Sequence, residues 1–151
     1  MTAARNIVCP HCARTNRVPA DRPARAARCG ACHHLLFEGR PAKANAAGFA
    51  KHRRNNDIPV LVDVWAPWCD PCRAMAPMFE QAAAELEPDV RLLKVNSEEE
   101  PGVASELGAR GIPALFLLHK GKVVAQTAGA METSRIVAWT RAQIAKAAGL
   151  P

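Results

Sequence analysis

The chain has 151 residues, 49% of them hydrophobic, and its 20 Lys and Arg outnumber its 14 Asp and Glu, which gives a formal net charge of +6. Residues 1–20 carry charged side chains and no apolar run of signal-peptide length, and no later run approaches the length of a membrane span. The sequence therefore gives no indication of secretion or of membrane insertion, and we expect a cytoplasmic protein with no membrane partner.

The charge is divided unevenly along the chain. Residues 1–56 contain eleven Lys or Arg against two acids, an excess of +9, whereas residues 57–151 contain nine against twelve, an excess of −3. The length fits one domain of about 110 residues plus a small module. We expect a module at residues 1–40 and a domain at residues 41–151, with a short linker around Gly39-Arg40-Pro41.

Four of the six cysteines form two CxxC pairs in the first module. Cys9 and Cys12 are separated from Cys29 and Cys32 by sixteen residues, which lies within the spacing of a four-cysteine zinc site. Four thiolates fill the tetrahedral shell of Zn²⁺ and leave no open position, so the predicted site is structural. About 40 residues with few large apolar side chains bury little surface, so the metal would supply much of the folding free energy.

Other interpretations of these four cysteines are two disulfides or an iron site. We expect the neighbouring histidines to be solvated rather than to act as ligands, since the thiolates already fill the shell; they are His11, His33 and His34. A further hypothesis is a redox sensor, in which oxidation of the thiolates releases the metal.

The loop between the two pairs is basic, which raises the hypothesis of a module that binds nucleic acid or a protein partner. Its arginines are Arg14, Arg17, Arg22, Arg25 and Arg28. No aromatic residue lies among them to stack on bases, so we expect a solvated face and no nucleic-acid partner.

Residues 41–151 show an alternation of helical and extended patterns. Asn45 is placed to cap a short helix that runs to Arg54, and His119 to Lys122 form a hairpin turn. Apolar runs predict strands at 58–65, 90–95, 114–118 and 123–127, and helical spacing predicts helices at 69–86, 98–107 and 132–148. This pattern predicts an α/β fold.

The third CxxC pair, Cys69-Asp70-Pro71-Cys72, follows Trp68 where a predicted strand ends and a helix begins. Unpaired N–H groups and the dipole at a helix N-terminus stabilise an anion, which lowers the pKa of a thiol at that position. Cys72 lies one turn further on the same face, within range of a disulfide, and Pro71 suits the first turn. By itself the pair fits either a redox dithiol or a metal site.

The surrounding residues favour the redox interpretation. The segment from Val60 to Arg73 resembles the active-site segment of the thioredoxin family, and Gly111-Ile112-Pro113 resembles its cis-proline loop. This resemblance covers residues 41–151. The CPxC and CGxC pairs resemble the amino-terminal extension of the zinc-containing thioredoxin-2 group. The resemblance implies a thioredoxin fold, a central mixed β-sheet flanked by helices, preceded by a four-cysteine zinc ribbon.

The resemblance also implies roles for individual residues. Cys69 would be the attacking thiol and Cys72 the resolving thiol, with Asp63 as the buried carboxylate beneath them. A carboxylate inside an apolar strand should have a raised pKa, which suits a base for Cys72. Lys94 resembles the family lysine that pairs with this carboxylate. The alternative for Asp63 is a purely structural residue satisfied by hydrogen bonds.

Pro113 would be the cis residue facing the disulfide, with an ordinary trans turn proline as the alternative. The implied substrate groove would pair the backbone of Ile112 with an extended peptide. Its lining residues would be Trp68, Asp70, Pro71, Ile112, Pro113 and Gly129. We expect Trp65, inside a strand, to be a packing residue.

Asp70 and Ala114 depart from the family pattern, which usually has glycine and threonine there. A negative charge about 6 Å from the Cys69 thiolate would raise the thiolate free energy by roughly 0.7 to 1.4 kcal/mol. Because this disfavours the reduced form, Asp70 should make the site more reducing by at most about 30 mV.

The sequence thus predicts a protein-disulfide reductase with a redox-active disulfide that maintains redox homeostasis. No phosphate loop or dinucleotide fingerprint is present, so electrons must come from outside the chain. The resemblance implies an NADPH-dependent thioredoxin reductase as donor and disulfide-containing proteins as acceptors, and we expect a monomer. An isomerase-like or oxidising protein with the same residues is the alternative.

Overall fold

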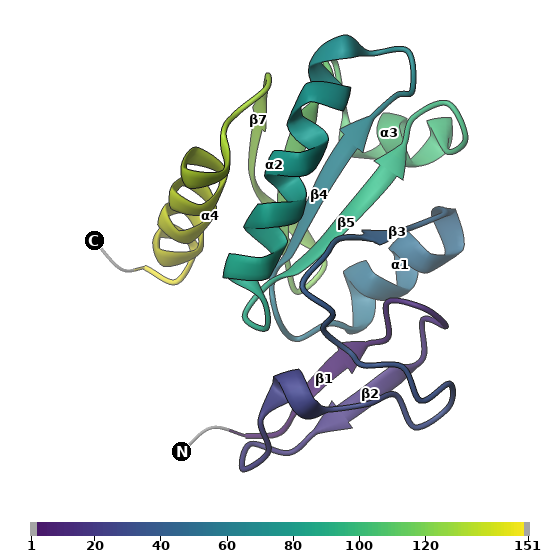
Figure 1. Cartoon of the computed structure of the whole chain (residues 1–151), viewed down its shortest axis with the longest axis vertical. Coiled ribbons are helices and arrows are strands. Elements are labelled where there is room, and N and C mark those ends of the chain that lie inside the picture. Colours follow the sequence, from purple (N-terminus) through teal and green to yellow (C-terminus); the bar gives the residue numbers. More distant parts are fainter. Residues whose placement is uncertain (1–2, 150–151) are drawn as a thin grey trace.

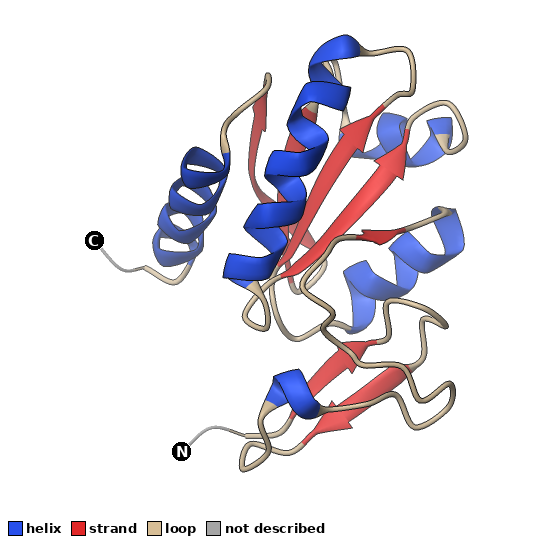
Figure 2. Ribbon diagram, in the orientation of Figure 1, coloured by secondary structure: helices blue, strands red, loops and turns tan. Residues whose placement is uncertain are grey.

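The computed structural model describes residues 3–149 and contains two separate β-sheets (Figures 1 and 2). The smaller sheet pairs β1 (Arg5–Val8) with β2 (Thr15–Val18) in antiparallel register, and a 3-10 turn, η1 (Ala24–Ala26), follows. We call residues 3–40 the ribbon module. The sequence patterns gave no separate signal for these strands, because four-residue strands carry little periodicity.

The larger sheet has five strands in the order β3-β5-β4-β6-β7. Strands β3, β5 and β4 run parallel, whereas β6 and β7 are antiparallel to their neighbours, so the sheet is mixed, as expected. The strands are β3 (Ala42–Lys43), β4 (Val60–Trp65), β5 (Arg91–Asn96), β6 (Ala114–His119) and β7 (Lys122–Ala128).

Four helices cover the two faces of this sheet. They are α1 (Ala46–Asn55), α2 (Asp70–Leu86), α3 (Pro101–Leu107) and α4 (Thr133–Ala147). One core cluster joins α1 and α3 to one face, and a second joins α2 and α4 to the other (Figure 1). Side chains alternate along β4, so Val62 and Val64 face α1 and α3 while Leu61 belongs to the cluster under α2. Asp63 shares the parity of Leu61 and therefore lies on the α2 side.

Most expected elements are present, with shifts at their ends. Asn45 caps α1 by accepting a hydrogen bond from the Gly48 N–H at 2.8 Å, as predicted. The helix expected from residue 98 begins at Pro101, because Asn96 Oδ1 accepts from the Glu98 N–H and holds the preceding residues in a turn. Strand β3 was not predicted, since two residues carry no pattern.

The ribbon module packs against α1 and the start of β4. The Asn6 carbonyl accepts a hydrogen bond from the Asp57 N–H at 2.9 Å, and the Asn6 N–H donates one to Asp57 Oδ2 at 2.7 Å. Asn56 Oδ1 accepts from the Val8 N–H at 2.8 Å, and Ile58 belongs to the core cluster of the ribbon module. Buried polar and apolar contacts therefore fix the module on the larger sheet.

No helix among residues 3–149 is long and apolar enough to cross a membrane.

Candidate active site and candidate metal centre

The third cysteine pair opens helix α2. Cys69 is the N-cap residue in extended conformation, and its Sγ accepts a hydrogen bond from the Cys72 N–H at 3.2 Å. Pro71 lies in the first turn, where a missing N–H costs nothing. Cys69 and Cys72 are joined by a disulfide, with a Cα–Cα distance of 5.2 Å. The sulfur of Cys69 therefore lies at the positive end of a 17-residue helix.

The loop before β6 approaches this disulfide from the other side. The Ile112–Pro113 peptide bond is cis, and the Ile112 carbonyl oxygen lies 3.8 Å from Cys69 Sγ. The Pro113 carbonyl accepts a hydrogen bond from the Gly129 N–H at 2.8 Å. Trp68, next to the disulfide, is 64% exposed, although Cys69 itself is only 5% exposed. The tertiary structure thus places Ile112, one of the predicted groove residues, beside Cys69, and joins the neighbouring Pro113 to Gly129.

Asp63 lies at the centre of β4 and is fully buried, and neither carboxylate oxygen has a hydrogen-bond partner among the described residues. Burial raises the pKa of Asp63 to about 7, although the positive charge of Lys94 opposes this rise. Lys94 is the register partner of Asp63 on β5. The Lys94 Nζ lies 4.7 Å from the centroid of the Trp65 ring. Lys94 and Asp63 form no ion pair within 4.0 Å. Lys94 therefore acts on Asp63 through its field rather than by contact.

Asp70 is highly exposed, with 87% of its side chain accessible, and it has a cationic neighbour. Arg73 Nη2 lies 3.4 Å from Asp70 Oδ1, and Arg73 Nη1 donates to the Pro67 carbonyl at 3.4 Å. Sequence reasoning did not include this pair, although the i,i+3 spacing on a helix was a signal for it. Because Arg73 offsets the charge of Asp70, the effect of Asp70 on the Cys69 thiolate is smaller than an unpaired charge would give.

The other four cysteines converge in the ribbon module. Their sulfurs all lie within 4.8 Å of one another, with Cys9–Cys32 and Cys12–Cys29 both at 3.5 Å, and all four are unbonded. A tetrahedron with Zn–S bonds of about 2.3 Å has edges of about 3.8 Å, so the sulfurs have the spacing of a four-thiolate site. The N–H groups of His11 and Cys12 point at Cys9 Sγ, as knuckle geometry requires.

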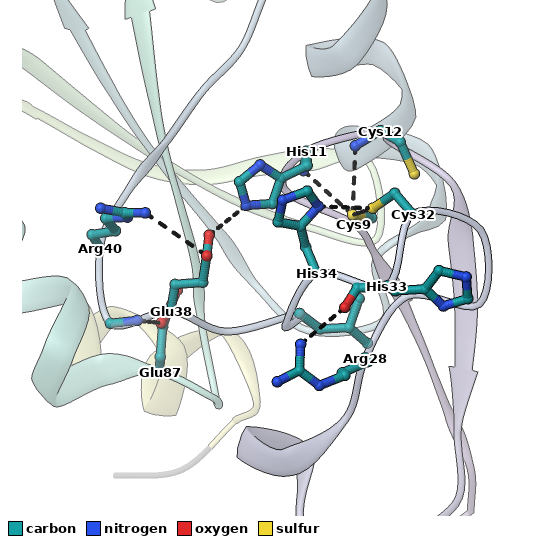
Figure 3. A network of polar contacts seen from close by, with 12 residues as sticks. Cys9, His11, Cys12, Arg28, Cys32, His33, His34, Glu38, Arg40 and Glu87 are labelled. Atoms are coloured by element: carbon teal, nitrogen blue, oxygen red, sulfur yellow. Dashed lines mark hydrogen bonds and ion pairs between the residues drawn. The ribbon is translucent and has the colours of Figure 1, made fainter.

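Two of the three nearby histidines, His11 and His34, form polar contacts on the exposed surface beside the cysteines (Figure 3). His34 Nδ1 lies 3.4 Å from Cys32 Sγ, and its ring stacks on His11 with centroids 3.9 Å apart. His11 Nε2 in turn lies 2.5 Å from Glu38 Oε1. His33 is exposed, as expected. All three histidines are therefore exposed and lie outside the four-sulfur cluster, as expected, and the contacts of His11 and His34 are an addition that the sequence did not predict.

A model of the thioredoxin family matches residues 40–142, and a zinc-ribbon model described as "Thioredoxin 2, N-terminal" matches residues 8–34. The chain belongs to the thioredoxin family. Its redox-active centre is the Cys69–Cys72 disulfide, and it is a protein-disulfide oxidoreductase with a reductase role. The predicted fold, family and activity class are confirmed.

Named relatives agree with this assignment. The chain is 38% identical over 143 residues to thioredoxin C-3 of Corynebacterium nephridii, which covers 95% of this chain and 98% of that protein. It is 41% identical over 90 residues to a thioredoxin of Porphyra purpurea, covering 60% of this chain and 84% of the relative. The crystal structure of chloroplastic thioredoxin z superposes with a TM-score of 0.64 at 26% identity, covering 70% of this chain and 96% of that one.

Proposed function

We propose that this member of the thioredoxin family reduces target disulfides through Cys69 as nucleophile and Cys72 as resolving thiol. The observation that carries the proposal is the position of Cys69 at the α2 N-cap, where the Cys72 N–H and the helix dipole stabilise a thiolate. Cys69 is also the cysteine beside the cis-proline loop, where a target peptide would dock.

The exchange has two steps. In the reduced protein, the Cys69 thiolate attacks one sulfur of a target disulfide, so that a Cys69–target bond forms and the target S–S bond breaks. Cys72 then loses its proton and attacks Cys69 Sγ, which releases the second target thiolate and forms the Cys69–Cys72 disulfide. The target gains two electrons and the protein loses two.

Asp63 is the proposed base for Cys72. Its support is the combination of full burial, placement on the α2 side of β4 and a pKa of about 7, near the working pH. Lys94 would tune that pKa through its charge. The substrate groove would consist of the backbone of Ile112, with Pro113, Gly129, Trp68, Asp70 and Pro71 around it.

For the ribbon module we propose a structural Zn²⁺ held by Cys9, Cys12, Cys29 and Cys32. The unbonded state and spacing of the sulfurs support a metal over two disulfides. Iron satisfies the same ligands, so metal analysis of purified protein identifies the ion. The proposed units are residues 1–40 for the zinc module and residues 41–151 for the thioredoxin domain.

The sequence has no dinucleotide fingerprint, so electrons would come from outside the chain. Membership of the thioredoxin family supports an NADPH-dependent thioredoxin reductase as the proposed donor. The acceptors would be disulfide-containing proteins of the cytoplasm, with the protein acting as a monomer.

Trapping experiments test the assignment of roles. With Cys72→Ser, a target disulfide should leave a stable mixed disulfide on Cys69, whereas Cys69→Ser should capture nothing. A mixed disulfide on Cys72 instead would reverse the roles. Equilibration with glutathione separates the reductase from the alternative, since a potential near the thioredoxin reference of about −270 mV supports a reductase and one near −180 mV supports isomerase or oxidising chemistry.

A further inference from the structure

Arg91 is buried in the protein interior, which is unusual for an arginine. It begins β5 of the large sheet, yet its side chain is fully buried and extends into the ribbon module. Arg91 Nη2 donates hydrogen bonds to the Val8 carbonyl at 3.0 Å and the Leu36 carbonyl at 2.7 Å. Its guanidinium carbon lies 4.6 Å from the centroid of the Phe37 ring. A residue of the large domain therefore bridges the segment before Cys9 and the segment after Cys32.

The charge of Arg91 is incompletely balanced by its own neighbours. Glu87 Oε2 lies 3.5 Å from Arg91 Nη1 without hydrogen-bond geometry, and Arg91 Nη1 and Nε have no hydrogen bond among the described residues. Glu87 is buried, which raises its pKa and weakens it as a counter-charge. Its Oε1 accepts from the Gly39 N–H at 2.7 Å. A buried guanidinium is costly unless other negative charge lies near it.

The four-cysteine site supplies that negative charge. Four thiolates around Zn²⁺ carry a net charge of about −2. Cys9 is fully buried and directly follows Val8, the residue whose carbonyl Arg91 binds. Burial lowers the pKa of Arg91 only to about 10, while the charges of Glu87 and Cys9 raise it, so Arg91 is a cation at neutral pH.

We propose that Arg91 is a positioning residue of the metal centre, which holds the two knuckle-bearing segments by their carbonyls and supplies a buried positive charge that stabilises the bound thiolates. The metal site of the ribbon module is then completed by the thioredoxin domain. This inference rests on the proposed four-cysteine metal site.

The test measures metal release from the full-length protein after loading with one equivalent of Zn²⁺. The rate is followed with a colorimetric chelator in excess. The variants are Arg91→Met, which removes charge and donors, Arg91→Lys, which keeps the charge, and Glu87→Gln, which removes the opposing charge but keeps an acceptor for Gly39. Phe37→Leu is the matched control for packing at the same place. Insulin reduction by each variant reports whether the thioredoxin domain is folded.

We expect Arg91→Met to release zinc at least about tenfold faster than wild type, and Arg91→Lys and Phe37→Leu to stay within about threefold. Glu87→Gln should release zinc at the wild-type rate or more slowly. Release from Arg91→Met within threefold of wild type, or faster release from Glu87→Gln, would overturn the proposal. If Arg91→Met does not fold, Glu87→Gln decides: zinc release at the wild-type rate or more slowly supports the proposal, and faster release overturns it. A wild-type protein that binds no metal would instead overturn the proposed metal site.

Discussion

Asp63 and Lys94 lie directly opposite each other on the parallel strands β4 and β5, yet their side chains form no ion pair and the Lys94 ammonium rests over the Trp65 ring. Asp63 is left in the core without a hydrogen-bond partner among the described residues. A fully desolvated carboxyl favours its neutral form, which explains why its pKa is raised to about 7. The site therefore holds a proton near the pH at which disulfide exchange operates.

Asp63 should make the folded protein less stable as pH rises. Its pKa is raised from 3.8 to about 7 in the native state, so between these values the native state binds a proton that the unfolded state has lost. The stabilising contribution is present below about pH 4 and is lost as pH rises through about 7. Relative to wild type, Asp63→Asn should therefore gain stability across this range, by up to about 4 kcal/mol above pH 7. Urea unfolding of both proteins at pH 5 and pH 8.5 measures the difference, and an equal gap at both pH values would contradict it.

The same substitution should slow disulfide exchange. If Asp63 accepts the proton of Cys72, the rate should rise through pH 7 in the wild type, and Asp63→Asn should lose that rise and at least about tenfold in rate at pH 8. Stopped-flow reduction of insulin, followed by tryptophan fluorescence, gives the two pH profiles. Coincident profiles would leave Asp63 as a structural residue.

Asp70 should lower the reduction potential by a small amount. Asp70→Gly removes a negative charge beside Cys69, which stabilises the thiolate of the reduced form and raises the potential by at most about 30 mV. Arg73→Met is the matched control, since it removes the cation paired with Asp70 at 3.4 Å and should shift the potential the other way. Glutathione equilibration measures both, and a lower potential for Asp70→Gly would be the wrong sign.

Removal of the metal should unfold the ribbon module and leave the large domain folded. The two core clusters of the five-stranded sheet contain only residues from Ala42 onward, so they do not depend on the cysteine cluster. After chelation, trypsin should cleave at Arg14, Arg17 and Arg25 at least about tenfold faster. Mass spectrometry of the fragments follows these sites, with Arg135 and Arg141 of α4 as internal controls. Equal acceleration at the α4 sites would show that the metal supports the whole chain.

The local chemistry was predictable because it depends on neighbours in sequence. A β-branched strand followed by CxxC and a helical pattern places Cys69 at an N-cap whatever surrounds it, and the spacing of two further CxxC pairs defines a four-sulfur cluster. Capping by Asn45 and the hairpin turn at His119 to Lys122 are likewise decided within four residues. The observed helix ends differ from the predicted ones where a short turn replaces the first residues of a helix, as before Pro101.

The sequence by itself determined the family, the redox pair, the cluster of four further cysteines and the order of most elements after Asn45, because each is encoded in residue type at short separation. Only the tertiary structure decided which distant groups meet. Arg91 binds Val8, 83 residues away, and Lys94 lies on Trp65 rather than on Asp63. An arginine within an apolar strand was a signal of burial, but its partners depend on how the ribbon module packs on the sheet. That packing arises from many small contacts between segments far apart in the chain, which no local pattern specifies.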